Sequence, residues 1–297
     1  MWQVQPTVIF GRNQVMEAEV NLPYCKEHGI QLYRRKSGGG CVYADMGNIM
    51  LSYISTCTDV SSTFDVFLQR LADALAGLGL DAGRSGRNDV LVAGRKVSGN
   101  AFFRLPSSSI VHGTMLFDSD FSCLEKAITP SADKVLSKGV SSVRQRVTNV
   151  KEELLKAGNV RYCDIDAFKS YLRESLCSGD SPILLDKSQI SEIEKIEEGY
   201  LNPDFISGRK HLYTVLRSGR TRAGGMGVRL AMDGDLIESL SLEGDCLPLS
   251  EDIDGLLTSL LAGKRLDQVE EALASTRMED LIMGLDTPSF IDILKGN

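Results

Sequence analysis

A run of glycines behind a basic cluster constrains this chain more than any other feature of its sequence. Residues 34–43 read Arg-Arg-Lys-Ser-Gly-Gly-Gly-Cys-Val-Tyr, so positive charges and a hydroxyl lead into glycines and then into β-forming residues. Glycine has no Cβ and reaches positive φ, which lets successive N–H groups line one anion-binding concavity. Arginine forks and backbone amides suit phosphate and carboxylate groups. The segment therefore predicts a site for both groups, and a glycine hairpin turn with basic flanks is the simpler alternative.

The residues after the glycines argue against two common nucleotide-binding folds. A dinucleotide-binding fingerprint needs G-x-G-x-x-G at the start of a helix, and a P-loop needs G-x-x-x-x-G-K-[ST]. Here the glycines lead into residues 41–43 and 48–54, which read as strands, and the P-loop pattern occurs nowhere in the chain. The glycines are thus predicted to lie between strands.

A second polar cluster surrounds a predicted hairpin. Residues 90–93 and 96–103 read as two strands joined by a tight Ala-Gly-Arg turn. Asn88 and Asp89 precede the first strand and Lys96 opens the second, so the hairpin brings them close enough to share one ligand. A lysine ammonium can stabilise negative charge that develops on a phosphoryl group. An ordinary edge-strand lysine is the alternative for Lys96 taken alone.

In this order, the two clusters resemble the lipoate–protein ligase A family. Similarity runs from the first residues to about Asn149 and continues more weakly to the C-terminus. The resemblance implies an α+β fold, with mixed sheets and flanking helices in a large biotin/lipoate-ligase-like catalytic domain and a small α+β C-terminal domain. The other matching pieces are residues 6–14, 19–21, Asp45, Asn48, 86–89, 94–99, 112–114 and 142–149.

The resemblance implies that the protein activates lipoate with ATP to give lipoyl-AMP, with Mg²⁺ accompanying the ATP. The lipoyl group would then pass to a lysine on a lipoyl domain of a 2-oxoacid dehydrogenase acyltransferase subunit, or on the glycine-cleavage H protein. A carboxylate that attacks the α-phosphorus meets like-charge repulsion, so this chemistry needs fixed positive charge and oriented amides. The two clusters supply both.

By the family motif, Lys96 is the catalytic residue and would bridge the α-phosphate and the acyl carbonyl in both steps. Successive strand residues face opposite ways, so Arg34 and Arg35 are not expected to reach the ligand together, and the family pattern favours Arg35. Residues 133–149 are implied to form a lid over the adenylate. No metal ligands are predicted. The implied ATP- and lipoyl-AMP-binding residues are Arg35, Ser37, Gly38, Gly39, Gly40, Cys41, Val42, Tyr43, Asn48, Asn88, Asp89, Lys96, His112, Arg144 and Arg146.

Two departures from the family pattern bear on substrate contact. Ala44 stands where members commonly carry histidine, just before Asp45. Members also usually have a helix and a strand before the segment that matches residues 2–6 here, and a missing strand would expose a sheet edge. Neither departure removes the glycine segment or Lys96, so the predicted function stands.

Composition agrees with a cytoplasmic enzyme. The 297 residues, 42% of them hydrophobic, suffice for two domains. No apolar run of membrane-spanning length and no export signal is present. The seven cysteines form no CxxC or CxxH pair, which argues against a disulfide framework or a zinc site. A net charge of −7 argues against nucleic-acid binding, and we expect a monomer that binds no membrane.

The chain is predicted to divide into a catalytic domain at 1–185, a linker at 186–210 and an accessory domain at 211–297. Asn149 with Glu152 resembles a capping box at the start of a helix. The remaining expected helices are 21–27, one with apolar positions from Phe64 to Leu75, 164–177, 188–199, 252–261, 266–274 and 289–294, and the expected strands of the accessory domain are 211–217, 222–232 and 237–242.

Two other functions remain open. An ATP-independent octanoyl or lipoyl transferase would take the acyl group from a carrier protein onto a cysteine or lysine, and Cys123 is the first cysteine to consider. A non-catalytic lipoate-binding protein is the alternative from another class. Segments 94–99 and 142–149 and the accessory domain favour the ligase.

Overall fold

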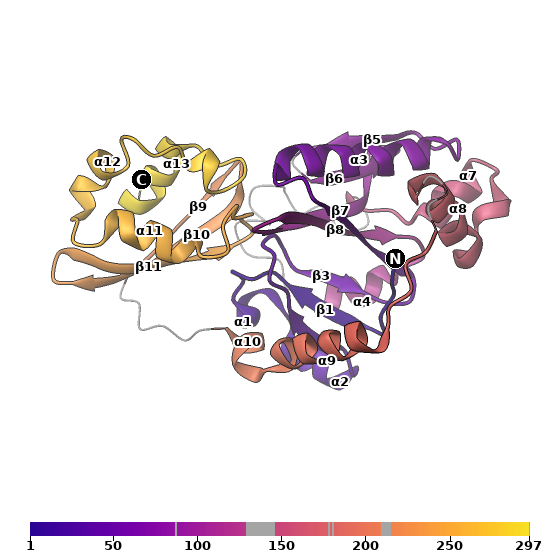
Figure 1. Cartoon of the computed structure of the whole chain (residues 1–297), viewed down its shortest axis with the longest axis horizontal. Helices are drawn as coiled ribbons and strands as arrows, with labels where there is room; N and C mark the ends of the chain where they lie inside the picture. Colours follow the sequence, from indigo (N-terminus) through magenta and orange to yellow (C-terminus); the bar gives the residue numbers. More distant parts are fainter. Residues whose placement is uncertain (87, 129–145, 178, 180, 209–214, 297) are drawn as a thin grey trace.

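The computed structural model describes residues 1–297 except 87, 129–145, 178, 180, 209–214 and 297. Within that part, the chain forms a larger and a smaller unit (Figure 1). The larger unit holds a five-stranded sheet in the order β4-β8-β7-β6-β5 and a three-stranded sheet in the order β2-β1-β3. The smaller unit holds a three-stranded sheet in the order β11-β10-β9. The predicted α+β class is confirmed.

The five-stranded sheet is antiparallel and carries the largest core. Helix α3 (Val60–Ala76) packs on one of its faces because apolar residues recur every three or four positions along the helix. Phe64, Leu68 and Leu71 are therefore almost fully buried. The strands and the further helices of this region are β4 (Asn48–Ser55), β5 (Ala82–Ser85), β6 (Asp89–Val92), β7 (Arg95–Leu105), β8 (Ser108–Leu116), α7 (Val150–Lys156) and α8 (Ile165–Cys177).

The predicted hairpin is confirmed as β6 and β7. Ala93 and Gly94 at its tip have φ values of 49° and 74°, the left-handed pair that matches the twist of a two-residue turn. The expected capping box is wrong: α7 begins at Val150, but the Asn149 side chain exchanges two 3.0 Å hydrogen bonds with the backbone of Ser119. A distant backbone partner thus outcompetes the local cap.

The smaller sheet of the larger unit frames the glycine segment. Strand β1 (Thr7–Phe10) lies in its middle, parallel to β2 (Gln31–Arg34) and antiparallel to β3 (Val42–Ala44). The chain leaves β2 and enters β3 on the far side of β1, so residues 35–41 cross the carboxyl end of β1. The glycines lie between strands, as predicted. Helices α1 (Met16–Glu19), α2 (Leu22–Glu27) and α4 (Phe121–Ala127) complete this region.

The linker region contains α9 (Lys187–Leu201) and α10 (Pro203–Ser207), which lie along the larger unit (Figure 1). The smaller unit follows, and its core draws on residues between 223 and 294. The limits 1–185, 186–210 and 211–297 stay a prediction. The elements of the smaller unit are β9 (Val215–Thr221), β10 (Gly224–Asp233), β11 (Leu236–Gly244), α11 (Ile253–Leu261), α12 (Val269–Ala272) and α13 (Thr287–Lys295).

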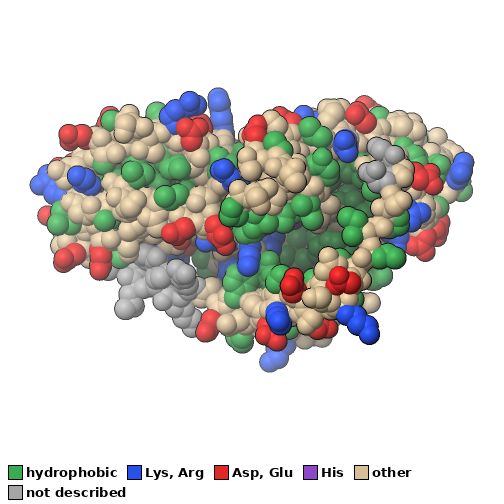
Figure 2. Space-filling model, viewed as in Figure 1, with side chains coloured by type: hydrophobic (Ala, Val, Ile, Leu, Met, Phe, Trp, Pro, Cys, Tyr) green, Lys and Arg blue, Asp and Glu red, His purple; other side chains and the backbone are tan. Residues whose placement is uncertain are grey.

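Strand β4 is an edge of the five-stranded sheet. Trp2 pairs with Met50 through two backbone hydrogen bonds of 3.0 and 2.8 Å. Further along that edge, Ser52 and Ile54 pair with β8 on one side, no strand of the described residues pairs with β4 on the other, and Ile54 is 69% exposed. A hollow lined by hydrophobic side chains opens between the body of the larger unit and α9 below it (Figure 2).

In the described part of the chain, every helix is too short or too polar to cross a membrane.

Candidate functional site

Arg35 holds the glycine segment in shape. Its guanidinium donates to the carbonyls of Gly38 (2.8 Å), Gly40 (2.7 Å) and Ile9 (3.0 Å), so it ties the segment to strand β1. Burial lowers the pKa of Arg35 to about 10, which still leaves it protonated at neutral pH. Its positive charge therefore lies directly beneath the glycine backbone.

Ser37 connects Arg35 to the neighbouring sheet. Arg35 Nε donates to Ser37 Oγ at 3.1 Å, and Ser37 Oγ lies 2.6 Å from His112 Nε2. Because the Ser37 oxygen accepts from Arg35, its hydroxyl is left to donate to a neutral His112. Burial and the Arg35 charge lower the pKa of His112 to about 3, which keeps the imidazole neutral. These side chains join the two sheets at the glycine segment.

We expect this neutral histidine to make folding sensitive to acid. Between about pH 6.5 and pH 3 the unfolded chain protonates His112 and the folded chain does not, so stability falls as pH falls, by at most about 1.4 kcal/mol per pH unit. His112→Asn removes this contribution. Urea unfolding at several pH values checks it: the gap in stability between wild type and variant should change from about pH 6 to pH 4 and be constant above pH 7. Parallel curves would contradict it.

Lys96 lies on the same face of the sheet as His112. His112 is in register with Ala101, and Thr114 continues the same face of β8. Toward its start, β7 has an irregularity that shifts the register between Val90 and Leu91. This shift turns Lys96 to the face of Gly99, where a Cβ on Gly99 would lie 2.6 Å from Lys96 Nζ.

Asp89 holds the ammonium of Lys96. Asp89 Oδ1 lies 2.7 Å from Lys96 Nζ, and both side chains are about one third exposed, at 32% and 35%. The sequence prediction that the hairpin brings these two residues together is confirmed. The glycine segment reaches the same face, since a Cβ on Gly39 would lie 3.7 Å from that of Ala101.

The end of the predicted lid is anchored beside Lys96. Val147 forms a parallel bridge with Lys96, and Thr148 N donates to the Lys96 carbonyl at 3.0 Å. Thr148 Oγ1 donates to Glu153, which also pairs with Arg95. Arg146 is exposed. Arg144 and the other residues of 133–145 lie outside the described residues.

Several other predicted site residues make contacts within the protein. Asn48 donates to the Tyr43 carbonyl and accepts from Met115 N. The Asn88 side chain donates to the Asn100 carbonyl at 2.7 Å, and the Asn100 side chain donates to the Asn88 carbonyl at 3.0 Å. Ala44 is fully buried, and Asp45 accepts from the backbone of Gly47 and Asp120, both at 2.9 Å. Val42 and Tyr43 begin β3, and Cys41 lies between this strand and the glycines.

Arg34 points away from this face, in agreement with the alternation expected between the two arginines. Its guanidinium donates to six backbone carbonyls and stacks 4.7 Å from the Phe10 ring. Burial lowers its pKa. Arg34 therefore joins the end of α10 to the loop after β1. The accepting carbonyls are those of Gly11, Arg12, Gln14, Phe205, Ile206 and Ser207.

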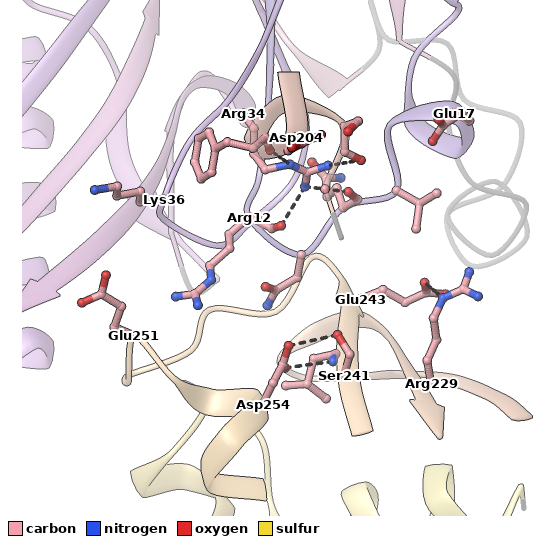
Figure 3. Close-up of a pocket in the computed structure, with 17 residues that line it drawn as sticks. Arg12, Glu17, Arg34, Lys36, Asp204, Arg229, Ser241, Glu243, Glu251 and Asp254 are labelled. Atoms are coloured by element: carbon pink, nitrogen blue, oxygen red, sulfur yellow. Dashed lines mark hydrogen bonds and ion pairs between the residues drawn. The ribbon is translucent and has the colours of Figure 1, made fainter. Parts of the chain in front are cut away.

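A cleft of about 670 Å³ lies between the two units. Figure 3 shows Arg12 and Lys36 on the wall of the larger unit, with Glu251, Glu243 and Arg229 across from them. Arg229 pairs with Glu243 at 2.5 Å. The cleft borders the glycine segment, because Arg12 N donates to the Ser37 carbonyl at 2.9 Å.

The smaller unit contributes a segment to the site that sequence reasoning missed. The carbonyl of Cys246 accepts from Gly39 N at 3.0 Å, so a residue far along the chain contacts the glycines. Nothing in the sequence around Cys246 signals this contact. In the described part of the chain, no group of three or more His, Cys, Asp or Glu side chains could hold a metal ion.

Comparison with known proteins identifies the family. Residues 1–177 match the family described as lipoyl protein ligase A/B catalytic domain. The lipoate-protein ligase LplJ of Bacillus subtilis (strain 168) is 31% identical over 299 residues, which cover 98% of this chain and 88% of the relative. Lipoate–protein ligase 1 of Staphylococcus aureus (strain Mu50) is 28% identical over 305 residues, with the same two coverages of 98% and 88%.

Solved structures share the fold. Plasmodium falciparum LipL1 in complex with lipoate covers 99% of this chain and 84% of its own at 21% identity, with a TM-score of 0.72. Lipoate-protein ligase A bound with ATP covers 69% and 83% at 26% identity, with a TM-score of 0.59. Because the family match spans residues 1–177 and the Bacillus relative is 31% identical across 98% of the chain, this chain belongs to the lipoate–protein ligase family.

Proposed function

We propose that this protein is a lipoate–protein ligase that forms lipoyl-AMP and pyrophosphate from lipoate and ATP and then transfers the lipoyl group to a lysine amine, which releases AMP. The observation that supports this most is the shared face of the sheet. Lys96, His112 and the glycine segment meet there, and a cation and backbone amides are what a reacting α-phosphate needs. Mg²⁺ would accompany the ATP.

In this proposal Lys96 stabilises the negative charge that develops in both steps. Its ammonium lies on the α-phosphate while the lipoate carboxylate attacks, and then on the acyl carbonyl while the acceptor amine attacks. Asp89 orients the ammonium at 2.7 Å. Arg35 holds the glycine backbone so that residues 40–43 present their amides to the nucleotide. Hydrogen bonds that are set before the reaction cost no reorganisation during it.

The proposed acceptors are lipoyl domains of 2-oxoacid dehydrogenase acyltransferase subunits and the glycine-cleavage H protein. The solved ligase of Thermoplasma acidophilum, described together with its E2 lipoyl domain, supports the first class at 27% identity and a TM-score of 0.60. We further propose that the protein acts as a monomer in the cytoplasm. Arg144 and Arg146 are proposed to contact the adenylate.

Transfer of lipoate to an apo lipoyl domain, followed by intact-protein mass spectrometry, tests the function. A ligase modifies the domain with free lipoate only when ATP is present. Modification from an acylated carrier protein without ATP would instead establish the transferase alternative. Binding of lipoate with no modification under either condition would establish a non-catalytic protein.

The cysteines separate ligase from transferase further. We expect Cys41→Ala and Cys123→Ala to retain most of the ATP-dependent activity, because a ligase passes the acyl group through the adenylate and not through a thioester. Cys123 is half-buried, with its sulfur 3.7 Å from the Tyr24 hydroxyl. Mass spectrometry of the protein after incubation with acyl donor and no ATP is the measurement. An acyl adduct on either cysteine would favour the transferase.

A further inference from the structure

The segment from Asp245 to Leu249 bridges the two units. On the side of the smaller unit, Asp245 N donates to Gly225 at 2.8 Å and Leu249 N donates to Leu281 at 2.8 Å. On the side of the larger unit, the Cys246 carbonyl accepts from Gly39 N at 3.0 Å. The segment is thus fixed to its own sheet and helices while it touches the glycines.

Gly38 has no room for a side chain because of this segment. A Cβ on Gly38 would lie 2.3 Å from the Cys246 carbonyl oxygen and 2.9 Å from Pro248 Cδ. Real Cβ atoms do not approach backbone oxygen that closely, so an alanine would push the segment away. Gly39 adopts a φ of +86°, which glycine alone tolerates without strain. These two glycines therefore suit docking of the smaller unit.

Leu247 anchors the segment in the larger unit. It is fully buried and belongs to the hydrophobic cluster of the five-stranded sheet, and a Cβ on Gly39 would lie 3.3 Å from Leu247 Cδ2. Two polar contacts flank the anchor: Gly244 N donates to the Asn13 carbonyl at 2.9 Å, and Gln14 donates to Asp245 at 3.3 Å. Asn13 and Gln14 also line the cleft between the two units.

The backbone groups of the glycine segment have different hydrogen-bond partners. The N–H of Gly39 donates to the smaller unit, and the carbonyls of Gly38 and Gly40 accept from Arg35. Among the described residues, no acceptor is recorded for the N–H of Gly40. Docking therefore engages the N–H of Gly39 and leaves that of Gly40, which leads into β3, outside the docking contact.

We propose that docking of residues 245–249 orders the glycine segment, so that Leu247 and the Cys246 carbonyl are positioning groups for the nucleotide site. The proposal rests on the proposed function for the identity of the nucleotide. Because docking orders residues that would otherwise lose conformational freedom when ATP binds, undocking weakens ATP binding. Docking and ATP binding are then linked, and each strengthens the other by the same factor.

Leu247→Ala tests the proposal in the full chain. Its matched control is Leu273→Ala, which removes an equally buried leucine from the core of the smaller unit without touching the glycines. In unliganded protein, hydrogen exchange of residues 38–43 should rise in Leu247→Ala and not in the control. The dissociation constant for ATP should rise about tenfold, a typical coupling between sites. In lipoate-dependent ATP–pyrophosphate exchange, KM for ATP should rise with little change in kcat.

Gly38→Ala is the second variant for the hydrogen-exchange measurement, since it displaces the segment without shortening a core side chain. Its control is Gly83→Ala, where a Cβ meets nothing within 4 Å. Equal hydrogen exchange of residues 38–43 in Leu247→Ala and Leu273→Ala would overturn the proposal. Tighter ATP binding by Leu247→Ala would also overturn it, because Cys246 would then compete with the nucleotide for Gly39. If wild type fails to bind ATP, the proposed function is wrong, and exchange in unliganded protein still decides whether docking orders the segment.

Discussion

Lys96→Ala is expected to abolish formation of lipoyl-AMP while the fold is retained. The ammonium lies on the sheet face that the glycine segment reaches, and Asp89 holds it at 2.7 Å. Loss of a contact that stabilises charge in the transition state typically costs about 10²–10³ in rate. Lipoate-dependent ATP–pyrophosphate exchange measures this first step without any acceptor protein. Circular dichroism and urea unfolding check the fold.

Lys151→Ala provides the control for a lost surface lysine. Lys151 pairs with Asp118 at 2.6 Å and is 36% exposed, about as exposed as Lys96, but it lies away from the glycine segment. Its replacement should leave the exchange rate nearly unchanged. Arginine at position 96 keeps the charge but changes its shape and reach, so Lys96→Arg should recover only part of the activity. Near wild-type exchange in Lys96→Ala would remove this residue from the mechanism.

Arg34→Ala is expected to cause a large loss in the free energy of unfolding. Arg34 is 5% exposed, and its guanidinium donates to six backbone carbonyls from the loop after β1 and the end of α10. Truncation removes the guanidinium donors of all six, and the carbonyl of Gly11 keeps a hydrogen bond from Gln14 N at 3.1 Å. Each unsatisfied buried acceptor costs about 1–3 kcal/mol, and partial relaxation reduces the sum, so we expect a loss of about 4 kcal/mol. Urea unfolding gives the value.

Arg84→Ala is the matched arginine control. Arg84 pairs with Asp65 on the surface, where side chains that are 35% and 62% exposed contribute about 0–1 kcal/mol. Hydrogen exchange locates the effect of Arg34→Ala, which should begin at residues 203–207 and in the loop after β1. A loss no larger than that of Arg84→Ala would mean that the carbonyls find other donors, and that Arg34 does not join the linker to the larger unit.

Local patterns in the sequence predicted the elements around the site well. The hairpin of β6 and β7 followed from an Ala-Gly turn between β-forming runs, and α3 followed from the spacing of Phe64 to Leu75. Both patterns reflect contacts between near neighbours, so the sequence contains what is needed. The capping box at Asn149 failed because Ser119, far away in sequence, binds that side chain more fully than the helix does.

The contacts of the predicted ligand residues were harder to foresee. Arg35 was predicted from the family motif to hold the nucleotide, and in this structure its guanidinium holds the backbone of the glycine segment. Ser37 and His112 were predicted as ligand contacts and bind each other at 2.6 Å. Residue type indicates which chemistry a side chain can perform. Its direction depends on packing between the two sheets, and no local pattern encodes that packing.

The sequence alone determined the family, the fold class, the position of the glycines between strands and the meeting of Asp89 with Lys96. Each of these depends on residue order within one short segment or on many motifs in a fixed order. Only the tertiary structure decided that Arg34 joins the linker to the larger unit, and that Cys246 contacts the glycine segment. Asn13 and Cys246, which lie 3.5 Å apart here, are separated by 233 positions in the chain. Such contacts arise from the packing of complete units, because burial of Leu247 and satisfaction of backbone groups act through space and not along the sequence.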